Sequence, residues 1–160
     1  MTHFHPERAR EMIDFDMLRA AATDAMRTAY AHYSGFPVGA AALVDDGRVV
    51  TGCNVEIQLR GLTMCAENTM VGQLALTGGG RLVAFTCVDP AGEVLLPCGR
   101  CRELLNEFGG PDLPIETPDG VRPLSDLLFG AWGPDSSSRV SARPAGTVLF
   151  RPQPLVESAE

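Results

Sequence analysis

Three cysteines in two short motifs, far apart along the chain, place the strongest constraint on the fold. The motifs are Cys65-Ala66-Glu67 and Pro97-Cys98-Gly99-Arg100-Cys101, and the hydrophobic pattern predicts that a helix begins at each of them. A helix N-terminus stabilises a thiolate through its free N–H groups and its macrodipole. The sequence therefore favours a fold in which two helix starts lie side by side and surround one point with three sulfur atoms.

Such a set of thiolates can hold one Zn²⁺ and leave its fourth position to water, as in catalytic zinc sites. Glu67 follows Cys65 by two residues. It can stand beside the metal without binding it, where a reaction needs a proton shuttle. The sequence thus predicts zinc as a cofactor, with Cys65, Cys98 and Cys101 as its ligands and Glu67 as the catalytic residue.

Other interpretations of the Cys-x-x-Cys motif are a redox pair or half of a structural zinc site. A structural site needs a fourth soft ligand, and the remaining cysteines, Cys53 and Cys87, both fall in predicted strands. Cysteines in strands are usually buried apolar residues. The presence of Cys65, Glu67 and Pro97 beside the motif favours the catalytic zinc site.

Hydrophobic periodicity predicts helices and strands in the order α-β-β-α-β-α-β-α. The segments are a helix from Asp14 or Asp16 to Tyr33, a hairpin of strands Val38–Val44 and Arg48–Val55, a helix Cys65–Leu76, a strand Arg81–Val88, a helix Cys98–Phe108, a strand Leu113–Thr117, a turn Pro118–Gly120 and a short helix Leu124–Phe129. The hairpin and the later βαβ crossovers imply an α/β domain with a mixed sheet sandwiched by helices. We expect a catalytic domain over residues 1–133 and a poorly ordered, Ser/Pro-rich tail over residues 134–160.

Charge and composition limit the partners of the chain. Its 160 residues fit one domain, and 13 basic against 20 acidic residues give a net charge of −7, which disfavours a polynucleotide partner. No apolar run approaches the ~18 residues that span a bilayer, and the charged N-terminus is unlike a secretory signal. We expect a cytoplasmic protein without disulfides and without a membrane partner.

At its motifs the chain resembles the cytidine deaminase family, in particular its small homo-oligomeric, zinc-dependent members from actinobacteria. The combination of Cys-x-Glu with Pro-Cys-x-x-Cys is the general motif of zinc nucleobase deaminases. The resemblance covers roughly residues 15–133 and includes Tyr33–Gly39, Gly52–Glu56, Gly61–Thr63, Cys65–Glu67, Pro97–Arg102 and the Leu127-Leu128 segment.

The resemblance implies an α-β-α layered fold and a zinc-dependent hydrolytic deamination of a free cytosine nucleoside. It also implies a homo-oligomer, with a tetramer favoured over a dimer. The residues that it places on the substrate side are Asn54 and Glu56 at the ribose hydroxyls, Phe36 at the base, the backbone of Ala66 beside the base, and Trp132 where a family aromatic residue reaches a neighbour's pocket. Trp132 fits equally well as a packed aromatic residue at a helix end.

The sequence departs from the family pattern at several positions. Ile57 and Arg60 stand where Asn and Tyr are usual, and Asn68 stands where an arginine often offsets the thiolate charge. Arg100 or Arg102 could supply that positive charge, and the resemblance favours Arg102. These departures leave open a deaminase specialised for a modified cytosine nucleoside, an aminopyrimidine or a cytosine-containing antibiotic. A non-catalytic, zinc-stabilised binding module is a second alternative.

Overall fold

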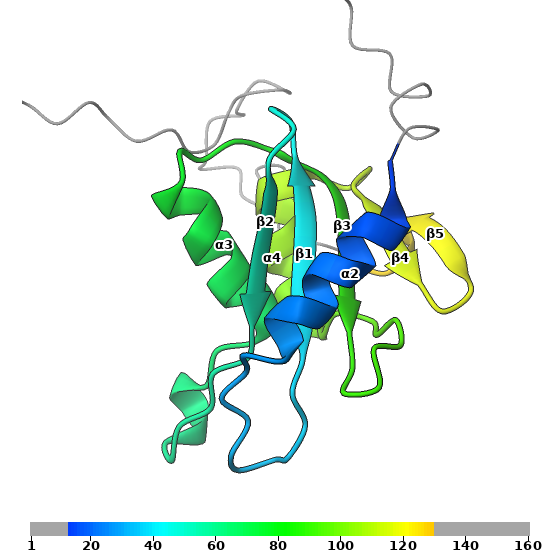
Figure 1. Ribbon diagram of the computed structural model, residues 1–160. Coiled ribbons are helices and arrows are strands. Elements are labelled where there is room, and N and C mark those ends of the chain that lie inside the picture. The colour runs from blue at the N-terminus through cyan, green and yellow to red at the C-terminus, as the bar shows by residue number, and fades with distance from the viewer. Residues whose placement is uncertain (1–12, 130–160) are drawn as a thin grey trace, which may run out of the picture.

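A mixed five-stranded sheet lies at the centre of the fold in the computed structural model, which describes residues 13–129 (Figure 1). Its strands, in the order β2-β1-β3-β4-β5 across the sheet, are β1 (Gly39–Val44), β2 (Val49–Cys53), β3 (Leu82–Val88), β4 (Pro114–Thr117) and β5 (Gly120–Pro123). β1 runs antiparallel to both β2 and β3, β3 runs parallel to β4, and β4 forms an antiparallel hairpin with β5. The predicted mixed α/β sheet is confirmed.

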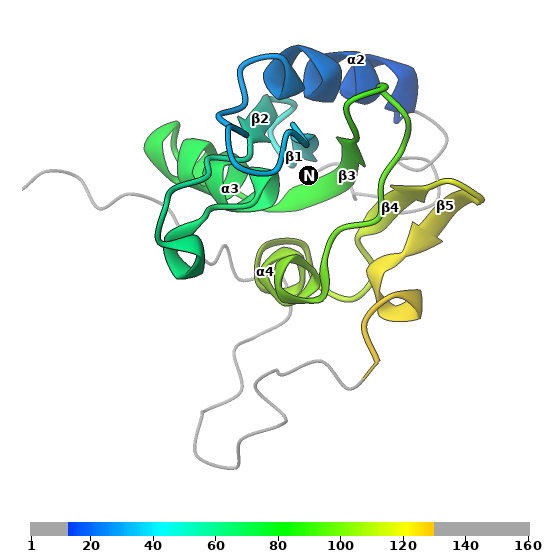
Figure 2. The same ribbon diagram turned by 90° about the horizontal axis from the view of Figure 1, so that it is seen from below.

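Three α-helices cover the two faces of this sheet. Helix α2 (Phe15–Met26) packs on one face, and helices α3 (Ala66–Leu76) and α4 (Gly99–Gly109) pack on the other, as Figure 2 shows. Two short 3-10 helices, η1 (Arg60–Leu62) and η2 (Leu124–Asp126), lie in the connections. Within residues 13–129, none of the helices has the length and apolar character that crossing a membrane requires.

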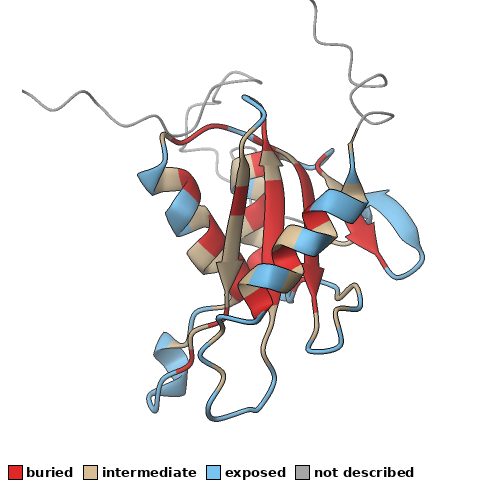
Figure 3. Cartoon of the chain, in the orientation of Figure 1, coloured by how far each residue is buried: buried red, intermediate tan, exposed pale blue. Residues whose placement is uncertain are grey.

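The central strands β1 and β3 are apolar except for Thr86, in keeping with the helices that cover both of their faces. Side chains of a strand point to alternate faces. In β1, Ala40 and Ala42 belong to the core on the side of α3 and α4, whereas Ala41 belongs to the core under α2. Figure 3 shows the buried residues concentrated in β1, β3 and the inner sides of the helices. Alanines in the middle of the sheet let both helix layers approach closely.

Helix α2 begins as predicted but ends earlier than its periodicity suggests. The side chain of Asp14 accepts a hydrogen bond from the backbone N–H of Met17 at 2.9 Å, which caps the first turn. The prediction of a helix through Tyr33 is wrong. The backbone of Tyr30 instead donates to the Asn54 carbonyl and accepts from the Glu56 N–H, at 3.0 and 2.8 Å. This pairing with the segment after β2 takes the backbone groups that a longer helix would use.

The end of the described chain also differs from the prediction. A second strand, β5, follows the expected turn and pairs with β4, and the predicted helix Leu124–Phe129 is reduced to the single 3-10 turn of η2. The sequence does not predict this strand, because Val121 is its one large apolar residue and that side chain is exposed at the sheet edge. An edge strand of this kind has no hydrophobic face to reveal it.

Gly52 sets how closely β2 can approach α3. A Cβ atom at this position would lie 2.3 Å from both the Ala66 carbonyl oxygen and the Met70 nitrogen, which is shorter than any real contact. We predict that Gly52→Ala lowers the free energy of unfolding by about 1–3 kcal/mol or more, because helix α3 must move away from the sheet. The measurement is the midpoint of urea unfolding.

Gly72→Ala is the matched control for this prediction. Gly72 lies in the same helix with open space around its Cα, so alanine should raise stability by about 0.5–1 kcal/mol through helix propensity. Equal effects of the two substitutions would contradict a packing constraint at Gly52.

Candidate metal centre and active site

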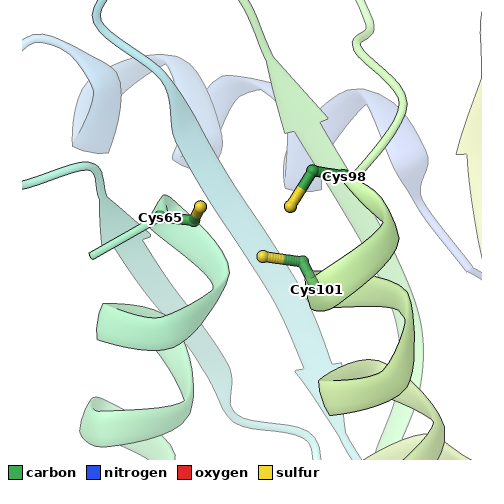
Figure 4. A group of neighbouring side chains, drawn as sticks. All are labelled: Cys65, Cys98 and Cys101. Carbon is green, nitrogen blue, oxygen red and sulfur yellow. The ribbon is translucent and has the colours of Figure 1, made fainter. Parts of the chain in front are cut away.

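The three predicted cysteine ligands lie together at the N-termini of two helices. Cys65 is the N-cap residue of α3, Cys98 is the N-cap residue of α4, and Cys101 lies in the first turn of α4. Their sulfur atoms all lie within 4.8 Å of one another, and Figure 4 shows them pointing toward a common centre. Within residues 13–129 this is the one group of three or more His, Cys, Asp or Glu residues that could hold a metal ion.

The local backbone explains why the sulfur atoms of Cys65 and Cys98 are free to face the common centre. Cys65 and Cys98 both have an extended backbone, with ψ near 160°, and neither side chain caps its own helix. The segment before Cys65 is fixed by two backbone hydrogen bonds between Met64 and Val55, at 2.9 and 3.0 Å. Each helix therefore presents a sulfur in front of its N-terminus, where the helix dipole favours a thiolate.

The thiols of Cys65 and Cys101 have pKa values shifted in opposite directions. The pKa of Cys65 is lowered to about 5, chiefly because Cys101 donates a hydrogen bond to it and also because the Arg100 guanidinium and Cys98 do so. The pKa of Cys101 is raised, since its thiol is the donor in that hydrogen bond and is also buried. Of these two, Cys65 is therefore the sulfur that loses its proton first.

Glu67 lies beside this group on the first turn of α3. The residue is 4% exposed, and burial raises the pKa of its carboxyl group, with a further increase from the negative charge of Cys65. A carboxyl group that burial makes harder to ionise is suited both to accept and to release a proton. The role of Glu67 as a proton shuttle stays a prediction.

Asn54 and Glu56 follow β2 and hold the neighbouring loop. The Asn54 side chain accepts from the Val38 N–H at 2.9 Å and donates to the Phe36 carbonyl at 3.0 Å. The Glu56 carboxylate accepts from the N–H groups of Tyr33 and Ser34 and from the Ser34 hydroxyl, at 2.9, 3.0 and 2.5 Å. Because a carboxylate offers about four acceptor positions and an amide has further capacity, both side chains keep hydrogen-bonding capacity for a ligand.

The other predicted substrate residues lie in different surroundings. Phe36 is 45% exposed on the loop that Asn54 and Glu56 hold, and Ala66 is fully buried at the start of α3. Trp132 lies outside the described residues, as does the predicted tail over residues 134–160. The roles of these residues toward a substrate therefore stay predictions.

Comparisons with known proteins agree with this site. A family model for the cytidine and deoxycytidylate deaminase zinc-binding region matches residues 14–117. The cytidine deaminase of Mycobacterium tuberculosis is 58% identical over 127 residues, which cover 79% of this chain and 96% of that protein. The chain belongs to the cytidine and deoxycytidylate deaminase family.

Solved structures of family members have the same fold. The crystal structure of cytidine deaminase from Mycobacterium tuberculosis superposes with a TM-score of 0.74 at 60% identity, covering 76% of this chain and 98% of that one. The enzyme from Mycobacterium leprae gives a TM-score of 0.72 at 54% identity, covering 73% of this chain and 98% of that one. These matches confirm the predicted family and fold class and make this chain a zinc-dependent deaminase.

The arrangement of donors fits the zinc of this family. Thiolates are soft ligands that zinc prefers, and a tetrahedral ion with Zn–S bonds of about 2.3 Å holds its sulfur atoms about 3.8 Å apart. Because the three sulfurs already lie within 4.8 Å of one another, small side-chain rotations bring them to that separation. Three protein ligands leave one position of a tetrahedral ion for the reaction.

Two arginines of α4 near this deaminase site have different partners. Arg102 donates to the carbonyl oxygens of Pro97 and Leu127, at 2.8 and 2.7 Å. Arg100, in contrast, donates to the Cys65 sulfur at 3.5 Å. The contact with a sulfur is thus made by the arginine that the family resemblance did not favour, and compensation of the thiolate charge by Arg102 stays a prediction.

Ser34 is a residue of this site that the sequence analysis missed. Its hydroxyl donates to Glu56 and accepts from the Phe36 N–H at 3.0 Å, so it links the carboxylate to the loop. A Ser-Gly turn directly before an aromatic residue is a weak signal for such a contact. Hydrogen bonds from Ser34 are the main reason that the pKa of Glu56 is lowered.

We predict that the effect of Ser34→Ala depends on pH. A carboxyl group with a lowered pKa in the folded state adds stability above the unfolded-chain pKa of about 4.3, and this stability is lost as pH falls through the folded pKa. Ser34→Ala should therefore lower the melting temperature at pH 7, and the difference from the unchanged chain should shrink between about pH 5 and pH 3.

The measurement is thermal unfolding followed by circular dichroism in the presence of a zinc chelator, so that loss of metal does not contribute. Ser125→Ala provides the control, because Ser125 is an exposed residue of η2. A Ser34→Ala difference that stays constant down to pH 3 would contradict the link to Glu56.

Proposed function

We propose that this chain catalyses the hydrolytic deamination of a free cytosine nucleoside. Cytidine or deoxycytidine and water would give uridine or deoxyuridine and ammonia. The observation that carries the proposal is the buried carboxyl group of Glu67 beside three sulfur atoms that lie within 4.8 Å of one another. Further support comes from relatives named cytidine deaminase, one of them 58% identical.

Cys65, Cys98 and Cys101 would hold the zinc through their thiolates. When bound, zinc lowers the pKa of water from about 15.7 toward about 7 and so supplies a nucleophile at neutral pH. Glu67 is not a ligand in this scheme. Its place on the first turn of α3, after the ligand Cys65, leaves the carboxylate free to exchange protons with water and substrate.

The proton balance of the reaction runs through Glu67. Its carboxylate accepts a proton from the attacking water, whose oxygen forms a bond to C4 of the pyrimidine ring. The carboxyl group delivers this proton to N3. It then takes the second proton from the new C4 hydroxyl group and passes it to the departing amino group, so that the C4–N bond breaks, the C4 carbonyl forms and ammonia is released. One group serves first as base and then as acid, for which a pKa raised by burial is suited.

Residues around the loop after β2 would bind the nucleoside. Asn54 and Glu56 would hold the ribose hydroxyls with the hydrogen-bonding capacity that their contacts to the loop leave unused. Phe36, exposed on that loop, would line the base pocket. The backbone of Ala66 would position the base, and Trp132 would contact it from the C-terminal segment.

The assembly and location of the chain belong to the same proposal. We infer a cytoplasmic homo-oligomer, with a tetramer favoured over a dimer, in which Trp132 reaches the pocket of a neighbouring subunit. The catalytic domain would comprise residues 1–133. A Ser/Pro-rich tail over residues 134–160 would follow this domain.

We predict that Cys98→Ala removes most of the bound zinc. The unchanged chain should carry about one zinc per chain, because three thiolates complete the protein's share of a catalytic site. Metal content after purification is the measurement. Cys53→Ala is the matched control, since Cys53 lies on β2 outside the sulfur cluster and its variant should keep the metal. Full zinc retention in Cys98→Ala would rule out this ligand set.

We predict that Glu67→Gln keeps its zinc but lowers kcat by at least ~10², because glutamine preserves shape and hydrogen bonding but cannot shuttle a proton. Loss of ultraviolet absorbance and release of ammonia are measured in parallel with cytidine and deoxycytidine. Normal turnover by this variant would require another acid and base.

The same assay distinguishes the alternative functions, which the family comparisons do not favour. Analogues substituted at N4 or C5 are included to test for a specialised deaminase, motivated by Ile57 and Arg60. Turnover of such an analogue well above that of cytidine would replace the proposed substrate. A zinc-loaded protein inert toward every compound would support a binding module instead.

A further inference from the structure

Arg100 joins the two chain segments that supply the sulfur atoms. It lies on α4, between Cys98 and Cys101, and one nitrogen of its guanidinium (Nη2) donates to the Thr63 carbonyl at 3.3 Å and to the Cys65 sulfur at 3.5 Å. Thr63 and Cys65 belong to the segment that leads into α3. A cation on one helix thus holds the ligand of the other helix.

Asn68 makes the reverse connection. It lies on α3, and its side-chain oxygen accepts from the Cys101 sulfur of α4 at 3.8 Å. The oxygen and nitrogen of an amide exchange places when the group flips, so an asparagine in this position can also donate to a sulfur. Asn68 can therefore contact Cys101 both as a thiol and as a thiolate.

The Arg100 contact, and the Asn68 contact once its amide is flipped to donate, address the main electrostatic problem of the site. Three thiolates outweigh the two positive charges of Zn²⁺, and the buried Glu67 carboxyl group lies beside them. A hydrogen-bond donor to a thiolate sulfur stabilises part of this excess negative charge. Groups that orient and hydrogen-bond metal ligands typically change metal affinity by 10–100-fold.

We propose that Arg100 and Asn68 are paired positioning residues for the metal ligands, each holding a sulfur of the opposite helix, and that together they set the affinity for zinc. Arg100 contributes a positive charge and a fixed link from Cys65 to the Thr63 carbonyl. Asn68 contributes a neutral hydrogen bond to Cys101. The inference rests on the proposed zinc-dependent function and concerns how this chain holds the metal.

The test is the dissociation constant for zinc, measured on the full chain by competition with a chromophoric chelator. Arg100→Gln removes the positive charge and should weaken zinc binding by 10–100-fold. Arg100→Lys keeps the charge but not the rigid planar guanidinium, so it should restore part of the affinity. Asn68→Asp places a carboxylate against the Cys101 thiolate and should weaken binding at least as much as Arg100→Gln.

A second measurement separates this role from a purely structural one. In the Co²⁺-loaded protein, sulfur-to-metal charge-transfer absorption reports how strongly each thiolate donates to the metal. Removing a hydrogen bond to sulfur should shift that absorption to longer wavelength in Arg100→Gln and Asn68→Asp. A side chain that only supports folding would lower the melting temperature without moving this band.

Arg122→Gln is the matched control, because Arg122 is exposed on β5 and its loss changes the net charge equally. Its zinc affinity should stay within about twofold of the unchanged chain. The inference is overturned if Arg100→Gln and Asn68→Asp also stay within that range. Should Arg100→Gln fail to fold, Arg100→Lys and Asn68→Asp decide by the same criterion. If the chain without substitutions binds no zinc, the proposed function is overturned as well. If that chain binds zinc and the variants bind it with the same affinity, this inference alone is overturned.

Discussion

Two parallel strands, β2 and β3, with β1 between them, determine where the three clustered cysteines meet. β2 and β3 both run antiparallel to β1, which lies between them, so they run parallel to each other. Their carboxyl ends therefore lie at the same end of the sheet. Helix α3 follows β2, helix α4 follows β3, and both pack on the same face (Figure 2). The N-termini of α3 and α4 therefore lie close together at that end of the sheet. Cys65 and Cys98 reach the site because each is the N-cap residue of one of these helices.

The site gathers negative charge in a protein that is already negative overall. Three thiols and the Glu67 carboxyl group lie together in a chain of net charge −7. The opposing groups are local: two helix N-termini and the guanidinium of Arg100, which contacts Cys65 directly. Burial at the same time makes ionisation of Glu67 less favourable and raises its pKa. Net charge thus bears on which macromolecules the protein repels, whereas the chemistry depends on dipoles and contacts within a few ångströms.

The sequence predicts most reliably those features whose cause is local. The Asp14 cap, the helix starts at the cysteine motifs and the apolar strands all follow from neighbouring residues. The end of α2 does not, because Tyr30 pairs with a segment distant in sequence. β5 escaped detection since an exposed edge strand carries no hydrophobic pattern. In the site, the grouping of Cys65, Cys98 and Cys101 follows from the motifs. The contact of Arg100 with Cys65 depends on how α4 packs beside the segment before α3, which no local pattern encodes.

Three consecutive residues after β2, Asn54 to Glu56, connect the loop that carries Phe36 to the segment directly before Cys65. The side chains of Asn54 and Glu56 hold the loop that carries Phe36. The backbone of Val55, between them, exchanges hydrogen bonds with Met64, the residue directly before Cys65. A nucleoside held by Asn54 and Glu56 would therefore be placed relative to the zinc by a short run of hydrogen-bonded backbone. Substitutions in this run should disturb binding and chemistry together, whereas a change confined to the Glu67 carboxyl group should affect the chemistry alone.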